Sequence, residues 1–179
     1  MFKEKKEWEV EPQLQKYVLG DLPRLSNPWV EVDHVYFLVN VGNYHWFLGL
    51  IDLPNWNLMN FDSLRGKEHD DKVTTLVVPI SRMLPWVLES VGYFDIKKNM
   101  VEKKGKIFHM CWLQSPHQLG FGDCGIFTCK FGEFMMHKKS HQLVEPYKIK
   151  YYREKYVVEL YYHVDIKRTR KMLGHDKHC

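Results

Sequence analysis

Residues 118–134 read QLGFGDCGIFTCKFGEF, and this stretch predicts a fold organised around one cysteine. Cys124 follows a turn that contains Gly120 and Gly122, and an apolar run typical of a buried helix begins directly after it. A cysteine in the first turn of a helix lies at the positive end of the helix dipole, which favours the thiolate over the thiol. The glycines allow a sharp turn and the close approach of a substrate chain. The alternative, a cysteine that only packs against the helix, stays open on the local sequence.

A catalytic role for this cysteine requires a histidine base and an orienting acid elsewhere in the chain. The segment VYFLVNVGNYHWFLGLIDLPNWNLMNFDSL, residues 35–64, is the best source of both. It predicts three strands, at 35–41, 45–52 and 57–62. Pro54 suits the second position of a type I turn between the last two strands.

The length of that turn sets the register of the predicted hairpin. A four-residue turn places Asp52 opposite Asn57. His45 and Asp62 then lie on the same face of the sheet, one diagonal step apart, where a carboxylate can orient an imidazole. A slip of one residue would put them on opposite faces. The alternative for His45 is a strand histidine without a catalytic role.

These residues together resemble a known family. HWFLGLIDL begins at His45, Asp62 follows 17 residues later in FDSL, and Gln118 comes six residues before Cys124 in GDCGIF. The order and both spacings resemble the ubiquitin-like-protein-specific cysteine proteases, the SUMO-protease type of the papain-related superfamily. VNV before the histidine and KFGEFMM after the cysteine are similar to plant members. The resemblance covers roughly residues 35 to 165.

The resemblance implies an α+β, papain-like fold. A central, mostly antiparallel or mixed sheet would pack on a buried helix with the nucleophile at its N-terminus. It also implies four catalytic roles: His45 as the base, Asp62 as the group that orients it, Cys124 as the nucleophile, and Gln118 in the oxyanion hole. A neutral amide can donate to an oxyanion without adding charge. Without the resemblance, Gln118 would be read as a polar loop residue.

The implied activity is cleavage after the C-terminal Gly-Gly of a ubiquitin-like, SUMO-like modifier, in maturation or deconjugation. Trp46 would wall a narrow tunnel for the glycine tail, and Gly122 and Asp123 would also contact the substrate. The partners are the modifier and its conjugates. One alternative is a catalytically degenerate domain that binds a ubiquitin-like protein, and another is an acyltransferase of the same superfamily. No metal or organic cofactor is expected.

The sequence departs from the family pattern in two places. An upstream Trp-Leu-x-Asp segment with its apolar helix is not found, so residues 1–34 are expected to be an N-terminal extension of a truncated catalytic domain. Residues 35–165 form the predicted protease domain, and residues 166–179 a basic C-terminal tail. Between Gln118 and Asp123 the chain reads Leu-Gly-Phe-Gly, where the family has an Asn-Gly or Asn-Ser pair.

The composition fits one globular domain and an intracellular location. The chain has 179 residues, of which 45% are hydrophobic and 15% aromatic, enough for a core of its own. Four cysteines show no metal-ligand spacing and are predicted to be reduced thiols of a nuclear or cytoplasmic protein, expected to be a monomer. No run of 18 apolar residues predicts a membrane span.

The charge is concentrated near the C-terminus. Residues 138–179 hold 11 Lys and Arg against 5 Asp and Glu, a net charge of +6. This tail predicts a nuclear-import signal, a contact for an acidic partner, or a solvated terminus. Aromatic residues do not alternate with the basic ones, so nucleic-acid binding is not expected.

Less distinctive segments complete the predictions. Helical spacing near the N-terminus relates Leu14, Tyr17 and Val18. A charged loop is predicted for residues 65–72. The next residues, 73–78, are predicted to be a short strand or the approach to a helix that begins near Ile80. The strand 107–113 is expected beside the His45 strand. A terminal helix from Tyr152 is predicted to pack a tyrosine stripe on the core, with disorder beyond Lys167.

Overall fold

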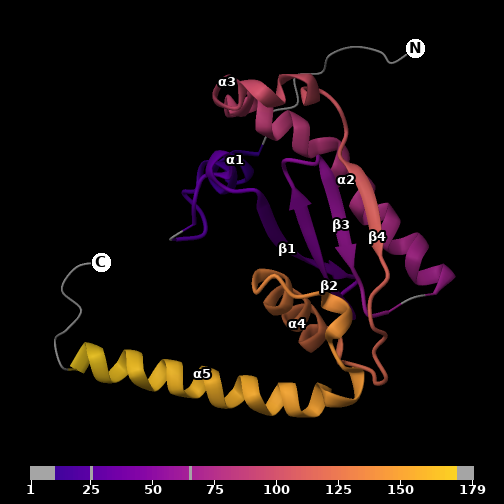
Figure 1. Cartoon of the computed structure of the whole chain (residues 1–179), viewed down its shortest axis with the longest axis vertical. Coiled ribbons are helices and arrows are strands. Elements are labelled where there is room, and N and C mark those ends of the chain that lie inside the picture. The colour runs from indigo at the N-terminus through magenta and orange to yellow at the C-terminus, as the bar shows by residue number, and fades with distance from the viewer. Residues whose placement is uncertain (1–10, 25, 65, 173–179) are drawn as a thin grey trace.

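A four-stranded mixed sheet lies at the centre of the computed structural model, which describes residues 11–24, 26–64 and 66–172 (Figure 1). The strands lie in the order β1-β2-β3-β4. Their bounds are β1 His34–Val41, β2 His45–Asp52, β3 Asn57–Phe61 and β4 His109–Leu113. β1 to β3 form an antiparallel meander, and β4 pairs with β3 in parallel.

The predicted register of the β2–β3 hairpin is confirmed. Asp52 pairs with Asn57, and the ladder runs on to Leu48 opposite Phe61. The Asp52 carboxylate accepts the backbone N–H of Asn55 at 3.2 Å and so stabilises the turn. Continuing the ladder by one pair puts Asp62 on the His45 side of the sheet.

The two faces of the sheet carry separate hydrophobic clusters, because side chains alternate along β2. Phe47 and Ile51 pack with helices α1 (Pro12–Leu19) and α2 (Lys67–Ser90). Leu48 and Leu50 pack on the other face against helix α4 (Cys124–Met136). The sheet is therefore covered on both faces, and α4 is buried as predicted.

Helix α2 corrects the prediction for residues 65–78. It begins at Lys67, so the charged residues 67–72 belong to its first turns and residues 73–78 are not a strand. Glu68 and Asp70 lie in the first turn, where negative charge is favoured by the helix dipole. Val73 and Val77, one helical turn apart, are both buried in the core.

Helix α2 contains two prolines and is followed by a charged segment. Pro79 and Pro85 both lie inside α2. The charged residues that follow fold into two short helices, α3 (Tyr93–Ile96) and η2 (Lys98–Lys103). Tyr93 and Phe94 of α3 are buried in the same cluster as the interior face of α2.

Strand β4 lies in a different place from the one predicted. It pairs with β3, opposite Asn57 to Phe61, and not with β2. The long α2 crossover allows this parallel pairing, which a short hairpin loop could not provide. Because β4 runs parallel to β3, the loop after β4 begins near the end of β3. Gln118 in this loop therefore lies near Asp62 although β4 does not pair with β2.

The N-terminal helix is present, as its spacing predicted. Val18 of α1 is buried, whereas Tyr17 is largely exposed. The Gln15 amide donates to the Ser90 hydroxyl at 3.2 Å, which ties α1 to the end of α2. The helix η1 (Trp29–Glu31) then leads into β1. Predictions for residues 1–10 lie outside the described residues.

The C-terminal helix α5 (Ile149–Met172) follows η3 (His141–Leu143) and η4 (Pro146–Lys148) and corrects two predictions. It runs along one end of the molecule, away from the sheet (Figure 1). Helix continues beyond Lys167 to Met172, where disorder was expected, and residues 173–179 lie outside the description. The stripe predicted to pack on the core is exposed after Tyr156, at Val157, Leu160, Tyr161 and Val164.

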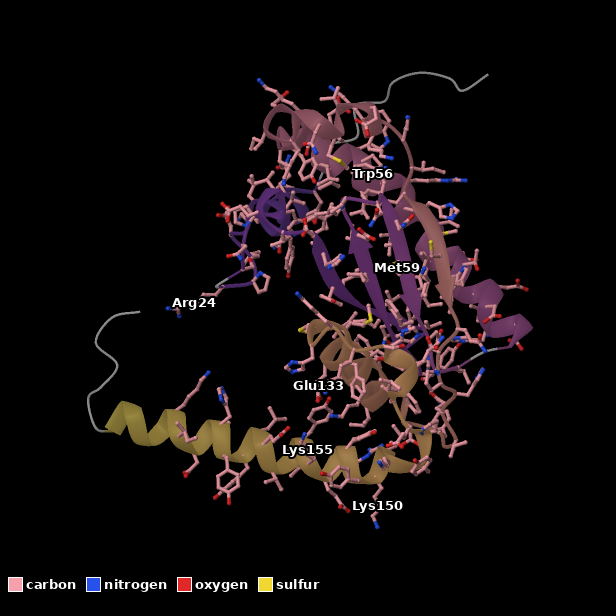
Figure 2. The ribbon with its side chains drawn as sticks, in the orientation of Figure 1. Arg24, Trp56, Met59, Glu133, Lys150 and Lys155 are labelled. Atoms are coloured by element: carbon pink, nitrogen blue, oxygen red, sulfur yellow. The ribbon has the colours of Figure 1, made fainter. Side chains whose placement is uncertain are left out.

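A buried lysine joins the first turns of α5 to α4. The Lys130 ammonium donates to Glu133 at 2.7 Å and lies 4.7 Å from the ring centroids of both Tyr152 and Tyr156. The Tyr156 hydroxyl donates to the same Glu133 carboxylate at 2.7 Å. Figure 2 shows Glu133 on the side of α4 that faces α5. These contacts hold only the first part of α5, which explains why the later turns are exposed.

Among the described residues, no helix combines the length and the apolar character that crossing a membrane requires.

Candidate active site

His45 and Asp62 are in direct contact at one end of the sheet. His45 is the first residue of β2, and Asp62 follows the last residue of β3. The His45 Nε2 and Asp62 Oδ1 atoms are 2.6 Å apart, and the two residues are only 1% and 2% exposed. The predicted proximity is therefore present, and it follows from the hairpin register.

The contact assigns separate tasks to the two nitrogens of the imidazole. Because Nε2 donates to Asp62, Nδ1 is the nitrogen that can exchange a proton with a thiol. Burial opposes ionisation of Asp62, but hydrogen bonds from His45, from the Leu64 backbone N–H and from His69 together lower the pKa of its carboxyl group. Asp62 is thus an anion at neutral pH and can stabilise an imidazolium at His45.

His69 is a second histidine on the same carboxylate, and the sequence reasoning missed it. Its Nε2 lies 2.8 Å from Asp62 Oδ2, and its ring meets the His45 ring edge-on with centroids 4.8 Å apart. His69 lies in the first turns of α2, within the segment 65–72 for which the sequence predicts a charged loop. The His69 side chain reaches Asp62 because α2 begins at Lys67. No local sequence pattern indicates this contact.

Cys124 begins α4 and is 5% exposed. The Thr128 hydroxyl, one helical turn later, lies 2.8 Å from the Cys124 carbonyl oxygen and 3.2 Å from the Trp46 carbonyl oxygen. Since Trp46 is adjacent to His45, this bond holds the start of α4 against the start of β2. The first N–H groups of an α-helix have no intrahelical acceptor and are suited to stabilise an anion.

Gln118 is fixed beside the histidine–aspartate contact. Its backbone N–H donates to the Ser63 carbonyl oxygen at 2.9 Å, and the Ser63 hydroxyl donates to its Oε1 at 3.0 Å. Its side-chain Nε2 donates to the Gly120 carbonyl oxygen at 3.2 Å. The amide donor predicted for the oxyanion hole is therefore used within its own loop, and the oxyanion role requires that this bond be exchanged for one to the substrate.

The three predicted substrate contacts have different surroundings. Trp46 is 42% exposed, as a residue that walls a substrate channel needs to be. Gly122 has a φ of 84°, a left-handed conformation that favours glycine. The Asp123 carboxylate accepts a hydrogen bond from the Arg153 guanidinium at 2.8 Å, and this bond links α5 to the residue before Cys124. Their contacts with substrate stay predictions.

An exposed apolar side chain beside the cysteine was not predicted as a site residue. Phe121, three residues before Cys124, is 93% exposed, and Leu119 is also exposed. The signal was present in the sequence, because both stand in a glycine-rich loop where a buried position is not expected. Large apolar side chains that reach into solvent next to a reactive group are suited to contact another protein.

His45, Asp62 and His69 also form the donor set for a metal ion among the described residues. One ligand atom from each residue lies within 4.8 Å of the others, and all three side chains are buried. The site thus combines an imidazole held by a carboxylate with a cysteine at the first residue of a helix, and these groups are components of thiol-based acyl chemistry.

Comparisons with known proteins agree with this chemistry. A family model described as the Ulp1 protease family, C-terminal catalytic domain, matches residues 2–167 and so extends upstream of residue 35. A sentrin-specific protease of Caenorhabditis elegans is 27% identical over 132 residues, which cover 72% of this chain and 16% of the relative. The chain thus spans about a sixth of the length of that curated relative.

Solved structures give the fold. A structure of the SUMO protease Ulp1 with its catalytic cysteine oxidised to a sulfonic acid has a TM-score of 0.50 and 19% identity, covering 79% of this chain and 57% of that chain. The Ulp1 protease domain in complex with Smt3, the yeast ortholog of SUMO, has a TM-score of 0.43 and 23% identity, covering 63% and 45%. The first likeness and the mixed sheet confirm the expected α+β, papain-like fold.

Proposed function

This chain belongs to the Ulp1 protease family, and from this premise we propose that it is a cysteine peptidase that cleaves after the C-terminal Gly-Gly of a SUMO-like modifier. The observation that carries the proposal is the buried 2.6 Å contact between His45 and Asp62, next to the helix that begins at Cys124. The family match and the sentrin-specific relative support the class of substrate.

The first step is attack by sulfur on the terminal glycine. His45 Nδ1 takes the thiol proton of Cys124, and Asp62 stabilises the imidazolium through Nε2. The thiolate attacks the glycine carbonyl carbon, and the oxyanion is stabilised by the backbone N–H of Cys124 and by the Gln118 amide once it leaves Gly120. Each oxyanion donor is typically worth about 3 kcal/mol.

The second step releases the products. His45 gives its Nδ1 proton to the departing amine, which is a lysine side chain in a conjugate or a peptide nitrogen in a precursor. A water molecule then attacks the thioester while His45 takes a proton from it, and the thiolate leaves. The modifier departs with a free glycine carboxylate, and the enzyme is restored without any cofactor.

Recognition of the modifier is proposed to involve exposed apolar residues next to the catalytic ones in the chain: Trp46 after His45, and Leu119 and Phe121 in the loop before Cys124. Trp46 narrows the approach to the sulfur, so that a glycine tail fits and a residue with a β-carbon does not. Phe121 and Leu119 extend from the preceding loop and supply apolar contact area for the body of the modifier.

The test is covalent capture by SUMO that carries an electrophile at its C-terminus, with ubiquitin carrying the same group as a comparison. We expect the SUMO probe to label the protein and Cys124→Ala to abolish labelling. Cys129→Ala is the matched control, since Cys129 lies on the same helix and is exposed. Labelling that persists in Cys124→Ala but disappears in Cys129→Ala would refute the assignment of the nucleophile.

A second candidate function is a non-catalytic domain that binds a ubiquitin-like protein. The observation that favours it is the bond from the Gln118 amide to the Gly120 carbonyl oxygen, which leaves the oxyanion donor engaged. This function predicts that the protein binds SUMO in a pull-down with equal affinity before and after Cys124→Ala, and that the electrophilic probe forms no covalent product.

A further inference from the structure

We propose that His45, Asp62 and His69 bind a divalent transition-metal ion of the zinc type, and that this ion reversibly switches off the base. Metal binding stands on the geometry of the three residues alone. Its inhibitory effect rests on the proposed function, because inhibition needs a reaction to inhibit.

The three donors come from separate elements and converge in the interior. His45 begins β2, Asp62 follows β3, and His69 lies in the first turns of α2. They are 1%, 2% and 8% exposed, so packing holds their side chains in place. A site held in this way loses little conformational freedom when it takes up an ion.

The donor set selects the kind of ion. Two imidazole nitrogens and one carboxylate oxygen match three-ligand zinc sites that keep a further position for water or substrate. Imidazole suits zinc, cobalt and nickel, whereas magnesium and calcium prefer oxygen ligands. The Asp62 carboxylate supplies the oxygen ligand, and each of its two oxygens faces one of the imidazoles.

The present distances are close to those that the ion needs. Each imidazole Nε2 already faces a separate oxygen of Asp62, at 2.6 Å for His45 and 2.8 Å for His69. With metal–ligand distances of about 2.0–2.2 Å, neighbouring ligand atoms in a tetrahedral site lie about 3.3 Å apart. Small rotations of the two rings away from the carboxylate therefore open the space for an ion.

Metal binding moves protons in a defined way. A neutral imidazole must present its Nε2 lone pair to the ion and carry its proton on Nδ1, and an imidazolium must first lose a proton to water. The buried Nδ1 of His69 has no hydrogen-bond partner among the described residues, so no partner opposes this shift. At His45 the same shift places a proton on Nδ1, where the Cys124 thiol needs an acceptor.

The ion therefore blocks catalysis without touching the substrate surface. With Nδ1 protonated and Nε2 bound to metal, His45 has no lone pair left to accept a proton. His69 is what distinguishes this site from a simple histidine–aspartate contact, which offers only two ligands.

The experiment is a titration of the full chain with Co²⁺, followed by visible absorption, and then displacement by Zn²⁺. We expect one equivalent of Co²⁺ to bind with the visible bands of nitrogen and oxygen ligation and without the near-ultraviolet charge-transfer band of a thiolate ligand. His69→Gln and His69→Leu should each weaken binding at least ten-fold. Two variants are used so that a folding defect in one, checked by circular dichroism, does not decide the result.

His34→Gln is the matched control, because the half-exposed His34 faces Asp52 at 3.9 Å in a contact that offers only two ligands, and its loss should leave the affinity unchanged. Unchanged Co²⁺ binding in both His69 variants, or a thiolate spectrum in the wild type, would overturn the site. Zn²⁺ inhibition of probe labelling should also weaken at least ten-fold in the His69 variants. If wild-type protein binds Co²⁺ but is not labelled by the SUMO probe in the absence of metal, the result counts against the proposed function and leaves the metal site supported.

Discussion

Removal of the Asp62 carboxylate gives the sharpest test of the site, because three donors depend on it. His45 donates to it at 2.6 Å, His69 at 2.8 Å and the Leu64 backbone N–H at 2.9 Å. A buried donor left without an acceptor costs about 1–3 kcal/mol. Loss of the acceptor for the two buried imidazoles in Asp62→Ala adds to roughly 2–6 kcal/mol, and the part-buried Leu64 N–H adds less, so the sum is a large share of the total stability of a domain.

Asp62→Asn should be much milder. Its amide oxygen can still accept from His45 and Leu64, and its NH₂ group can donate to His69 if that ring takes its other tautomer. The loss is then the difference between charged and neutral hydrogen bonds, about 1–2 kcal/mol. Catalysis should nevertheless fall by about 10²–10⁴-fold in kcat/KM, because the imidazolium loses its counter-charge.

The assay is equilibrium urea unfolding, followed by the fluorescence of the six tryptophans. Asp71→Ala, on the exposed face of α2, is the control and should change the free energy of unfolding by less than about 0.5 kcal/mol. If Asp62→Ala and Asp62→Asn unfold at the same urea concentration with the same slope, the carboxylate does not hold the three donors, and the reasoning fails.

Three further predictions concern Asp62, the Lys130–Glu133 pair and Phe121. The pKa of Asp62 is lower in the folded protein than in the unfolded chain, where it is about 4, so its contribution to stability is complete above about pH 4. As the pH falls below about 4, the free energy of unfolding should therefore decrease, and it should decrease less steeply in Asp62→Asn. Glu133→Gln should cost about 3 kcal/mol in urea unfolding, more than Lys130→Met, because it leaves Lys130 buried without a counter-charge. Phe121→Ala should raise KM for a SUMO substrate at unchanged kcat and stability; a lowered kcat with unchanged KM would contradict a binding role.

Local sequence predicted the parts of the site that depend on short-range geometry. The turn at Pro54 fixed the β2–β3 register, and period-2 alternation then placed His45 and Asp62 on one face. The glycines before Cys124 and the apolar run after it predicted the helix that begins at that residue. In both cases a few neighbouring residues determine the geometry, so their identities are enough.

The rest depended on contacts between elements far apart in the chain. Parallel pairing of β4 with β3 and the direction of α5 depend on which surfaces are left to be covered, and strand or helix periodicity does not specify that. The approach of His69 to Asp62 depends on where α2 begins and how its Val73 packs on the core.

The sequence by itself thus determined the nucleophile's helix and the histidine–aspartate register. Only the tertiary structure placed a second histidine on the carboxylate, engaged the Gln118 amide within its own loop, and joined α4 to β2 through Thr128. The physical reason is that backbone periodicity constrains a side chain's direction within one element, whereas distances between elements are set by how the whole core packs.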